Sequence, residues 1–458
     1  MKNYVVVGLG ASGLSAVKFL LEQGHRVAVS DNHPSPALAK QLPSTVTTAF
    51  GAIDAELLLN ADGIVISPGI DPLIEPVSRA KQAGVPIYSD IQLFAQALRD
   101  QDKAQGGHTP IVAITGSNAK STVTTLVGEM AKNAGKVVGV GGNIGTPALE
   151  LLKIKGLELV VLELSSFQLE HVSGLGATVA TILNLSADHL DRHGTMQNYL
   201  AQKLRIFDGV KQAVICLDDK ELSAQCQAVL PSDVVVTTTS GQLGACCHGD
   251  FCLLEQAGEI YLCHQGTHLL NADKLLIKGK HNLLNALSAL ALGHAVGLPM
   301  EHMLETLKSF AGLPHRCQFV AKVADKAYFN DSKGTNIGST IAAVDGLGAV
   351  YGKRSLALIL GGQGKGQDFS ELAPFVESFA CVVCLIGEDA PKITQELLTV
   401  PVLAGRLVQA DTLEAAVTLA SQSHAKAVLL SPACASFDQF VGYQQRGERF
   451  VELVSQLK

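Results

Sequence analysis

The chain of 458 residues carries 35 Lys and Arg against 42 Asp and Glu, which gives a net charge of −7 at pH 7. Hydrophobic residues make up 47% of it, so it is apolar enough to fold into about three domains and is not a disordered chain. The mild negative charge and the lack of a basic run argue against a nucleic-acid partner, and no apolar stretch is long enough to enter a membrane.

The first residues of the chain and its cysteines indicate the cellular compartment of the protein. The apolar run at residues 4–7 leads into glycines without a cleavage site, which predicts a strand and not a secretion signal. The 10 Cys are scattered through the chain, which predicts reduced thiols and a cytoplasmic protein. Cys and His residues gather between positions 246 and 264, but their uneven spacing does not favour a zinc site.

Residues 1–98 alternate β-rich runs with helical stretches. Strands are expected at 4–7, 26–30, 63–67 and 86–88, and helices at 12–23 and 91–98. This alternation predicts a parallel sheet with crossover helices, a Rossmann-like first domain. The polar stretch 99–109 contains a Gly pair and predicts a linker.

The glycines of this first domain form a motif, Gly8-Leu9-Gly10-Ala11-Ser12-Gly13, that follows a strand and opens a helix. Asp31 ends the next strand about twenty residues later, as in fingerprints for ligands that contain a pyrophosphate. A nicotinamide oxidoreductase would carry such glycines too. A phosphate loop elsewhere in the chain favours a nucleotide-type substrate instead.

The second predicted domain, residues 99–312, has strands at 111–114, 159–164, 178–183 and 212–217. Short β-like runs over 234–277 predict a small antiparallel insertion in it. Gly312-Leu313-Pro314 ends its last helix. The domain is therefore expected to bind a mononucleotide through the motif that follows its first strand.

That motif, residues 115–122, reads TGSNAKST and precedes a helix expected over 122–134. Backbone N–H groups, the helix N-terminus and the charge of Lys120 predict a cradle for a triphosphate, with Lys120 at the β/γ-phosphates and Ser121 or Thr122 on Mg²⁺. Ala119 stands where Gly is usual, which we expect to be tolerated if its φ is negative. The alternative is an ordinary strand-to-helix turn.

Two nearby segments supply candidate metal ligands. Glu163 lies in an otherwise apolar strand, where an unpaired carboxylate is costly unless a cation or partner compensates it. Residues 183–193 place five ionisable groups, His189 among them, just after another apolar strand. Alone this segment predicts a solvated loop with capping Asp residues, and beside a phosphate loop it predicts a metal and substrate site.

The third predicted domain, residues 313–458, has strands at 327–330, 355–360, 381–386 and 427–430. Polar loops at 330–336, 361–366 and 431–438 each follow one of these strands. Loops at the same end of one parallel sheet converge, so together they predict a binding site. The fold class is therefore α/β, with three consecutive α/β domains, the last again Rossmann-like.

Ten motifs along nearly the whole chain resemble the Mur ligase family of ATP-dependent amide-forming enzymes. They are GLGASG, SPGI at 67–70, TGSNAKST, GGNIG at 141–145, LELSSFQLE at 162–170, KHNLLNA at 280–286, LPHR at 313–316, NDSKGTN, GGQGKG and SPACASFDQF. LELSSFQLE and SPACASFDQF are most similar to the member that adds D-glutamate.

The resemblance implies small-molecule substrates and a monomer. The first domain would hold the UDP-sugar UDP-MurNAc-L-Ala, the second ATP with two Mg²⁺ or Mn²⁺ ions, and the third D-glutamate as it closes over the others. An acyl phosphate would form on the sugar's carboxylate and react with the amino acid. A related ligase for another amino acid or for a folate, and a nucleotide-dependent sensor without ligase activity, are the alternatives.

The resemblance also implies roles for individual residues. UDP-sugar contacts would come from Gly10, Ala11, Ser12, Asp31, Gly69, Asn143, Ser165 and His189. Nucleotide contacts would come from Gly116, Ser117, Asn118, Ala119, Lys120, Ser121, Thr122, Asn282, Asn285, Arg316 and Asp331. Metal ligands would be Ser121, Glu163, His189 and Lys203, and catalytic residues Lys120, Asn143, His189 and Lys203. D-Glutamate would meet Lys333, Thr335, Lys365, Ser436, Phe437 and Tyr443.

Lys203 would act as a carbamate formed with CO₂, which turns a positive side chain into a negative one able to bind Mg²⁺. Composition alone favours a surface lysine on a helix over 199–207. Asn32-His33 depart from the usual Thr-Arg of similar proteins, which leaves the UDP contacts there open.

Overall fold

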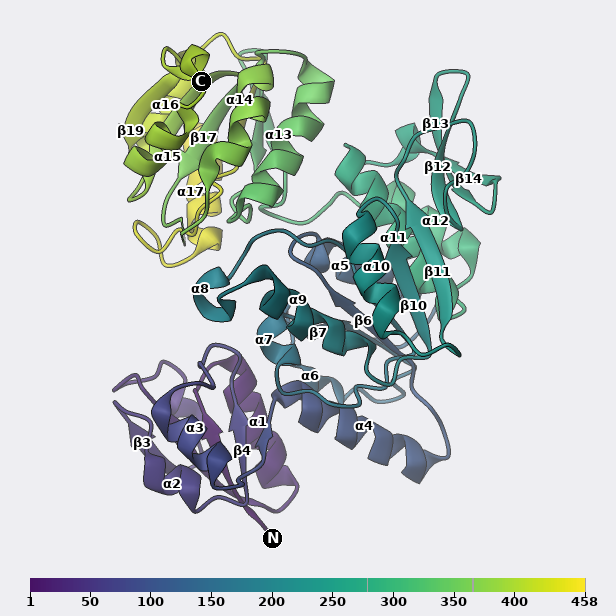
Figure 1. Cartoon of the computed structure of the whole chain (residues 1–458), viewed down its shortest axis with the longest axis vertical. Coiled ribbons are helices and arrows are strands. Elements are labelled where there is room, and N and C mark those ends of the chain that lie inside the picture. The colour runs from purple at the N-terminus through teal and green to yellow at the C-terminus, as the bar shows by residue number, and fades with distance from the viewer. Residues whose placement is uncertain (278, 365, 458) are drawn as a thin grey trace. The chain divides into compact units, whose positions relative to one another are not determined.

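A computed structural model describes every residue except 278, 365 and 458 and contains three mixed α/β domains, each built on its own sheet (Figure 1). The described residues form two compact units. The first comprises Met1–Asn184, Gln197–Leu270 and Ala286–Leu307, and the second comprises Leu185–Met196, Asn271–Asn285 and Lys308–Lys458.

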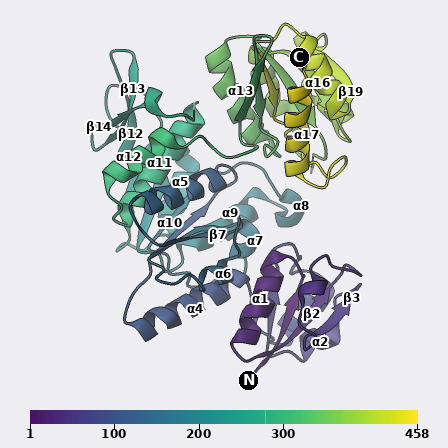
Figure 2. The ribbon, with the colours of Figure 1, turned by 180° about the vertical axis from the view of Figure 1, so that it is seen from behind.

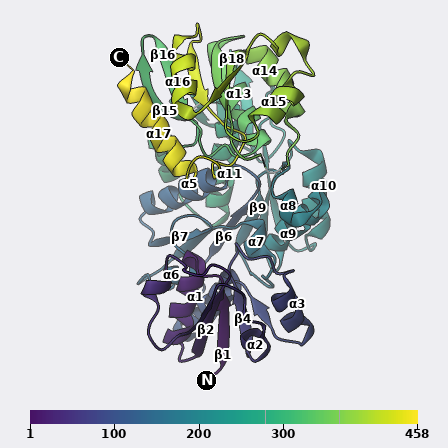
Figure 3. The same ribbon diagram turned by 90° about the vertical axis from the view of Figure 1, so that its left-hand side faces the viewer.

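The N-terminal sheet is parallel and has the strand order expected for a Rossmann-like domain. Its strands run in the order β3 (Thr47–Phe50), β2 (Arg26–Asp31), β1 (Asn3–Val7), β4 (Gly63–Ile66) and β5 (Ile87–Tyr88). Its helices are α1 (Ala11–Glu22), α2 (Ala55–Leu59) and α3 (Glu75–Gln82). Figure 3 shows α1 on one side of this sheet and α3 on the other. Alternate β1 side chains, Val5 and Val7, pack with Val77 of α3, as the two-residue period of a strand requires.

The central sheet has nine strands. Their order is β14 (Thr267–Asn271), β13 (Glu259–His264), β12 (Phe251–Gln256), β11 (Val235–Ser240), β10 (Gln212–Cys216), β9 (Val179–Ile182), β6 (Ile111–Thr115), β8 (Leu159–Glu163) and β7 (Val138–Gly142). The strands from β7 to β12 pair in parallel, whereas β12 and β13 are antiparallel. The carboxyl ends of β6, β7 and β8 therefore lie at one edge.

Nine α-helices and two 3₁₀ turns, one of them at Ala272–Lys274, accompany or follow the central sheet among the described residues. The others are α4 (Asp90–Gln105), α5 (Lys120–Asn133), α6 (Ala148–Leu151), α7 (Ser166–Leu169), α8 (Leu190–His193), α9 (Met196–Leu204), α10 (Lys220–Val229), α11 (Lys280–Ala295), α12 (Met300–Ser309) and a 3₁₀ turn at Arg205–Phe207. Helix α4 packs against α1, α6 and α7 within the first unit.

The C-terminal sheet follows the order β15 (Gln318–Val323), β16 (Lys326–Asn330), β20 (Ala427–Leu430), β17 (Leu356–Gly361), β18 (Ala380–Ile386) and β19 (Leu407–Asp411). Among the described residues of this sheet, only the β15–β16 pair is antiparallel. Helices α13 (Ile337–Tyr351), α14 (Ala373–Phe379) and α15 (Ala390–Leu397) cover one face, and α16 (Leu413–Gln422) and α17 (Tyr443–Gln456) cover the other. Of these helices, Figure 2 labels α13, α16 and α17.

One expectation about these elements is wrong, and another holds only in part. The stretch 99–109 is no open linker, because α4 continues to Gln105 and ends at Gly106 with a φ of 67°. Asp102 secures this end by accepting hydrogen bonds from Arg99 and from the backbone N–H of Thr109. The region 234–277 is antiparallel only in part, because β12 and β13 pair antiparallel as expected whereas β11 and β12 extend the central sheet in parallel.

Strands β3, β7, β15 and β19 are absent from the sequence-based expectation, since they are short, exposed or rich in Gly and lack a clear apolar period. Among residues 1–457 other than 278 and 365, no helix has the length and apolar character of a membrane span.

Candidate functional site

A cavity of about 420 Å³ opens beside the glycine loop of the first domain. Six of the residues expected to contact a UDP-sugar line it, namely Gly10, Ala11, Ser12, Asp31, Gly69 and Asn143. Asp31 holds the loop in place, because its side chain accepts a hydrogen bond of 2.6 Å from the backbone N–H of Leu9. Gly13 allows close packing there, since a side chain would collide with the carbonyl of Gly8. The N-terminus of α1 thus faces a space suited to an anionic group.

Asn143 connects this cavity to a buried acid of the central sheet. It lies just after β7 and donates a hydrogen bond of 2.7 Å to Oε1 of Glu163 at the end of β8. Glu163 is only 2% exposed, and its Oε2 has no hydrogen-bond partner among the described residues. Strand register places Glu163 opposite Ile114 and Gly142, so the acid lies at the edge where the phosphate loop begins.

The phosphate loop is compact and is held by the neighbouring strand. Asn184, just after β9, accepts a 2.8 Å hydrogen bond from the backbone N–H of Asn118 through its side chain. Its backbone carbonyl accepts another from Ser117. Lys120 folds back over the loop and donates to the carbonyls of Gly116 and Ser117, at 2.9 Å each. Asn184 was not among the expected residues, although its place at the end of a strand beside β6 marks it.

Ala119 adopts the conformation that we expected it to avoid. Its φ is 64°, in the left-handed region, so the expectation of a negative φ is wrong. A side chain there costs about 1–2 kcal/mol relative to right-handed backbone. The turn that brings successive N–H groups of the loop together demands this conformation, and Ala119 adopts it at that cost.

Lys203 lies beside the same loop and is no surface residue. It is 1% exposed, and its Nζ donates to the carbonyl of Gly116 at 2.9 Å and lies 3.5 Å from Oγ1 of Thr115. The Nζ also lies 4.4 Å from the ring centre of Tyr199, whose hydroxyl is 3.3 Å from Oγ of Ser117. The composition-based expectation of an exposed lysine is therefore wrong, because α9 packs its polar end under the loop.

His189 belongs to the second unit. It stands at the start of α8 with a φ of 54°, and its Nε2 lies 3.6 Å from Oδ2 of Asp188. That same oxygen accepts a hydrogen bond from Asn336, which begins α13. A shared metal site for His189 and Glu163 stays a prediction.

Three residues expected to meet the nucleotide, Asn282, Asn285 and Asp331, lie in the second unit and have hydrogen-bond partners there. Asn285 donates to Asn282 at 3.1 Å. Asp331 accepts from the Ser431 hydroxyl at 2.7 Å and from the backbone N–H of Cys317 at 3.0 Å. Burial raises the pKa of Asp331 to about 6, and these hydrogen bonds together with the charge of Arg316 oppose the rise.

The loops of the C-terminal sheet contact one another, as their positions predict. Ala433 donates its N–H to Gly334, and Gln363 exchanges backbone hydrogen bonds with Ala435. Lys333 lies with its Nζ 4.1 Å from the ring centre of Tyr443. The remaining expected residues differ in exposure: Ser436 is buried, Phe437 is 70% exposed, Thr335 follows Lys333 in the turn, and Lys365 lies outside the described residues.

Arg446 organises these loops and was missed from the sequence. It is 1% exposed and donates to the carbonyls of Ser332, Cys434 and Ala435. A signal existed, because Arg446 shares the four-residue period of Phe450 on the buried side of α17.

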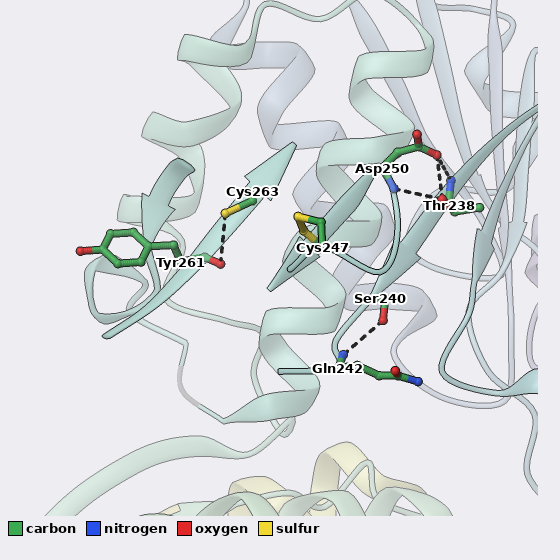
Figure 4. The surroundings of a disulfide bond; sticks show 8 residues. Thr238, Ser240, Gln242, Cys247, Asp250, Tyr261 and Cys263 are labelled. Carbon is green, nitrogen blue, oxygen red and sulfur yellow. Dashed lines mark hydrogen bonds between the residues drawn. A yellow bond between two sulfur atoms is a disulfide. The ribbon is translucent and has the colours of Figure 1, made fainter. Parts of the chain in front are cut away.

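The cysteines between β11 and β12 are not all reduced. Cys247 and Cys252 form a disulfide with Cα atoms 5.5 Å apart, so the expectation of free thiols is wrong at these positions (Figure 4). The bend between the strands brings the two backbones within bridging range. Asp250 stabilises that bend through hydrogen bonds with Thr238. This region is remote in sequence from the motifs above.

The chemistry of the first unit fits a phosphate and a divalent cation. The unpartnered oxygen of Glu163 is a hard anionic ligand, and Ser121 is buried in the first turn of α5. The described residues contain no group of three or more Cys, His, Asp or Glu able to hold a metal ion. Mg²⁺ suits such a place, because it is usually bound by one or two carboxylates plus substrate phosphates and water.

Comparison with known proteins gives matches along the chain. Residues 2–89 match the Mur ligase MurD-like N-terminal domain, residues 114–293 the Mur ligase middle domain, and residues 315–434 the Mur ligase glutamate ligase domain. A UDP-N-acetylmuramoylalanine–D-glutamate ligase from Psychrobacter arcticus is 55% identical over 99% of this chain and 94% of its own. A protein of the same name from Acinetobacter baylyi is 51% identical over 99% and 98%.

Solved structures show the same fold. A UDP-N-acetylmuramate-alanine ligase from Thermotoga maritima superposes with a TM-score of 0.62 at 19% identity over 100% of both chains. MurF from Acinetobacter baumannii superposes with a TM-score of 0.60 at 17% identity over 87% of both chains.

Proposed function

Since this chain belongs to the Mur ligase family, we propose that its cavity and phosphate loop serve one reaction, the joining of D-glutamate to UDP-N-acetylmuramoyl-L-alanine. The chain is an ATP-dependent ligase of peptidoglycan precursor synthesis. The observation that carries the assignment of residues is Asn143, which lines the cavity and bonds Glu163 beside the phosphate loop. The Asn143 side chain thus connects the proposed binding site of the UDP-sugar with the proposed site of phosphoryl transfer.

The cavity of the first unit is the proposed seat of the UDP-sugar. Gly10, Ala11 and Ser12 begin α1, where free N–H groups and the helix dipole attract a diphosphate. Asp31 fixes the loop by its bond to Leu9 and lines the same wall. The carboxylate of the sugar's L-alanine would then extend toward Asn143.

The phosphate loop is the proposed seat of ATP. Lys120 contacts two loop carbonyls at 2.9 Å, which holds its charge where the terminal phosphates would lie. In the first step the substrate carboxylate attacks the γ-phosphorus, ADP leaves, and an acyl phosphate forms. Lys120 and the loop N–H groups stabilise the negative charge that spreads over the phosphoryl oxygens.

In the second step the amine of D-glutamate attacks the acyl carbon. The tetrahedral intermediate expels phosphate, the nitrogen loses a proton, and an amide remains. The loops that carry Lys333, Thr335 and Ser436 are the proposed seat of D-glutamate, since Arg446 and the Ala433–Gly334 bond hold them together. Lys333 offers a cation for a substrate carboxylate.

Mg²⁺ would be held in the first unit by Glu163, Ser121 and Lys203, and when bound it neutralises phosphate charge and polarises the transferred group. Two ions are proposed. Lys203 is proposed to react as its neutral amine with CO₂, forming an N–C bond and releasing one proton, so that the side chain becomes an anionic ligand. Its burial beside the Gly116 carbonyl supports this, because a buried ammonium is poorly solvated.

The test measures phosphate release with ATP, Mg²⁺ and UDP-MurNAc-L-Ala, supplied with D-glutamate, L-glutamate or another amino acid. We expect release with D-glutamate alone, with amide product in equal amount. Equal phosphate release with another amino acid would refute D-glutamate as the specific substrate. Nucleotide binding without formation of the amide product would favour a nucleotide-dependent sensor without ligase activity. We further propose a monomer acting in the cytoplasm, which gel filtration and cell fractionation check.

A further inference from the structure

A second buried acid, Asp90, lies behind the cavity of the first unit and has no place in the reaction described above. It is the first residue of α4, whose preceding residue Ser89 caps the helix through the N–H of Gln92. Asp90 is 2% exposed, and neither carboxylate oxygen has a hydrogen-bond partner among the described residues. Such a group lowers the free energy of unfolding.

The neighbours of Asp90 are two residues of the cavity wall. The side chains of Ser12, in the first turn of α1, and Gln168, in α7, lie close enough to oppose the rise in the pKa of Asp90 that burial causes. Both residues line the cavity. Asp90 is not itself among the residues that line the cavity, and its helix α4 packs against α1 and α7, which carry Ser12 and Gln168.

The segment around Gln168 is linked to the ligand residues as well. Oε1 of Gln168 accepts from the backbone N–H of Ser165 at 3.1 Å, as part of a capping box. The capping box uses the oxygen of Gln168 and leaves its amide nitrogen able to donate, and the carboxylate of Asp90, which has no hydrogen-bond partner among the described residues, lies nearby. Ser165 follows Glu163 by two residues, so this group joins the sugar-nucleotide wall to the strand that carries the metal ligand.

The position of Asp90 at a helix N-terminus is the simpler explanation for an acid there. A carboxylate in the first turn gains about 0.3–1 kcal/mol from the helix dipole. Exposed acids, Glu75 of α3 and Glu221 of α10, have such positions without being buried. Burying the Asp90 carboxylate without a full set of hydrogen-bond partners costs more free energy than the helix dipole supplies. The position at the helix N-terminus therefore does not explain the burial, and this carboxyl has another role.

We infer that Asp90 is a positioning residue for the UDP-sugar substrate, whose buried carboxyl orients the Ser12 hydroxyl and the Gln168 amide at the cavity wall. This inference rests on the proposed function of the cavity. With Asp90 present, the Ser12 side chain already has the orientation that the substrate needs. Less side-chain rotamer freedom is then lost when the UDP-sugar binds. Without it, Ser12 and Gln168 are free to turn away from the ligand.

The experiment compares Asp90→Ala with the wild-type enzyme, and Asp100→Ala, which removes an exposed acid of the same helix, is the matched control. Calorimetry measures binding of UDP-MurNAc-L-Ala and of ATP, and initial rates give KM and kcat. We expect Asp90→Ala to weaken binding of the UDP-sugar and raise its KM about tenfold. The KM values for ATP and D-glutamate, kcat and the Asp100→Ala enzyme should change less than about twofold.

Two further variants separate positioning from a general role in folding. Asp90→Asn keeps a polar group of the same shape and should restore the KM to within about threefold of the wild type. Asp90→Ala should melt no lower than the wild type, since it removes a buried unpartnered charge. Ser12→Ala should weaken binding too, and adding Asp90→Ala or Asp90→Asn to it should have little further effect.

Unchanged UDP-sugar binding in Asp90→Ala would overturn the inference. So would a parallel rise in all three KM values with a lower Tm, or full additivity with Ser12→Ala. Failure of the wild-type enzyme to bind UDP-MurNAc-L-Ala would instead refute the proposed function of the cavity, and with it the role of Asp90.

Discussion

Glu163→Gln tests the link between an unpaired buried charge and metal binding. Gln keeps the oxygen that accepts the 2.7 Å hydrogen bond from Asn143 and removes the charge from the oxygen that has no partner. Glu163 is 2% exposed, so the charge is almost wholly desolvated. Gln places an amide NH₂ in that position, and a buried neutral amide costs less to desolvate than a buried charge, by about 1–3 kcal/mol. The variant should therefore be more stable than the wild type when no divalent cation is present.

The size of the effect in a melting experiment follows from this free energy. In a protein unit of this size, 1 kcal/mol shifts Tm by about 2–4 °C, so Glu163→Gln should raise Tm by about 2–12 °C in EDTA. Adding Mg²⁺ with ADP should raise the Tm of the wild type above that with ADP alone, because the cation binds only the folded state. The same addition should leave Glu163→Gln almost unchanged, and its turnover should fall at least ~10²-fold.

The assay is differential scanning fluorimetry beside phosphate release. Glu158→Gln is the matched control, since it removes an exposed acid just before the same strand and should alter neither Tm nor the Mg²⁺ effect appreciably. A lower Tm for Glu163→Gln in EDTA, or equal protection of both proteins by Mg²⁺, would refute the reasoning from the unpartnered oxygen.

Four more changes have expected outcomes. Lys120→Ala should lower turnover at least ~10²-fold through loss of charge at the phosphates, and near-normal phosphate release would exclude the loop from catalysis. Lys203→Ala should be largely inactive and partly restored by small carboxylic acids, whereas full activity without them would remove the lysine from the site. Ala119→Gly should raise the free energy of unfolding by about 0.5–1 kcal/mol because φ is 64°, and a lower Tm would contradict this. The pKa of Asp331 is about 6 in the folded protein, above the ordinary 3.8. Between these two pH values the folded protein keeps a proton that the unfolded chain releases. The acid therefore lowers the free energy of unfolding increasingly as pH rises from 3.8 through 6, by up to about 3 kcal/mol. Asp331→Asn should thus gain more stability at pH 7.5 than at pH 4.5, and denaturant unfolding that shows equal effects at both pH values would refute the shift.

Local pattern was a good guide to the elements of this fold. The apolar runs at residues 111–114 and 427–430 appear as β6 and β20, and the glycine loop and the phosphate loop each stand between a strand and a helix as expected. Pattern failed where polarity was mistaken for disorder. Residues 99–105 are polar because most of them are exposed on the last turns of α4, whereas Asp102 is buried and hydrogen-bonded, and not because the chain is open there.

The candidate site was predictable in its residue types and not in its contacts. A charged residue within an apolar strand identified Glu163 in the sequence. The structure agrees with that signal, because Glu163 is buried and one of its carboxylate oxygens has no hydrogen-bond partner among the described residues. Lys203 had no such mark, because a lysine on a short amphipathic helix is usually exposed. Asn184 and Arg446 each had a signal in the sequence, but their partners, backbone groups of loops 66 and 114 residues away, could not be read from it.

The order of strands and helices, the nucleotide-binding loops and the acid at the end of β8 were determined by the sequence itself, because each depends on residues within one or two turns of one another. Tertiary structure alone decided that Lys203 meets Gly116, 87 residues away, and that Asp90 lies behind Ser12. The physical reason is that sheet order and helix packing set which distant groups share a desolvated space, and neighbours in the sequence carry no record of that choice.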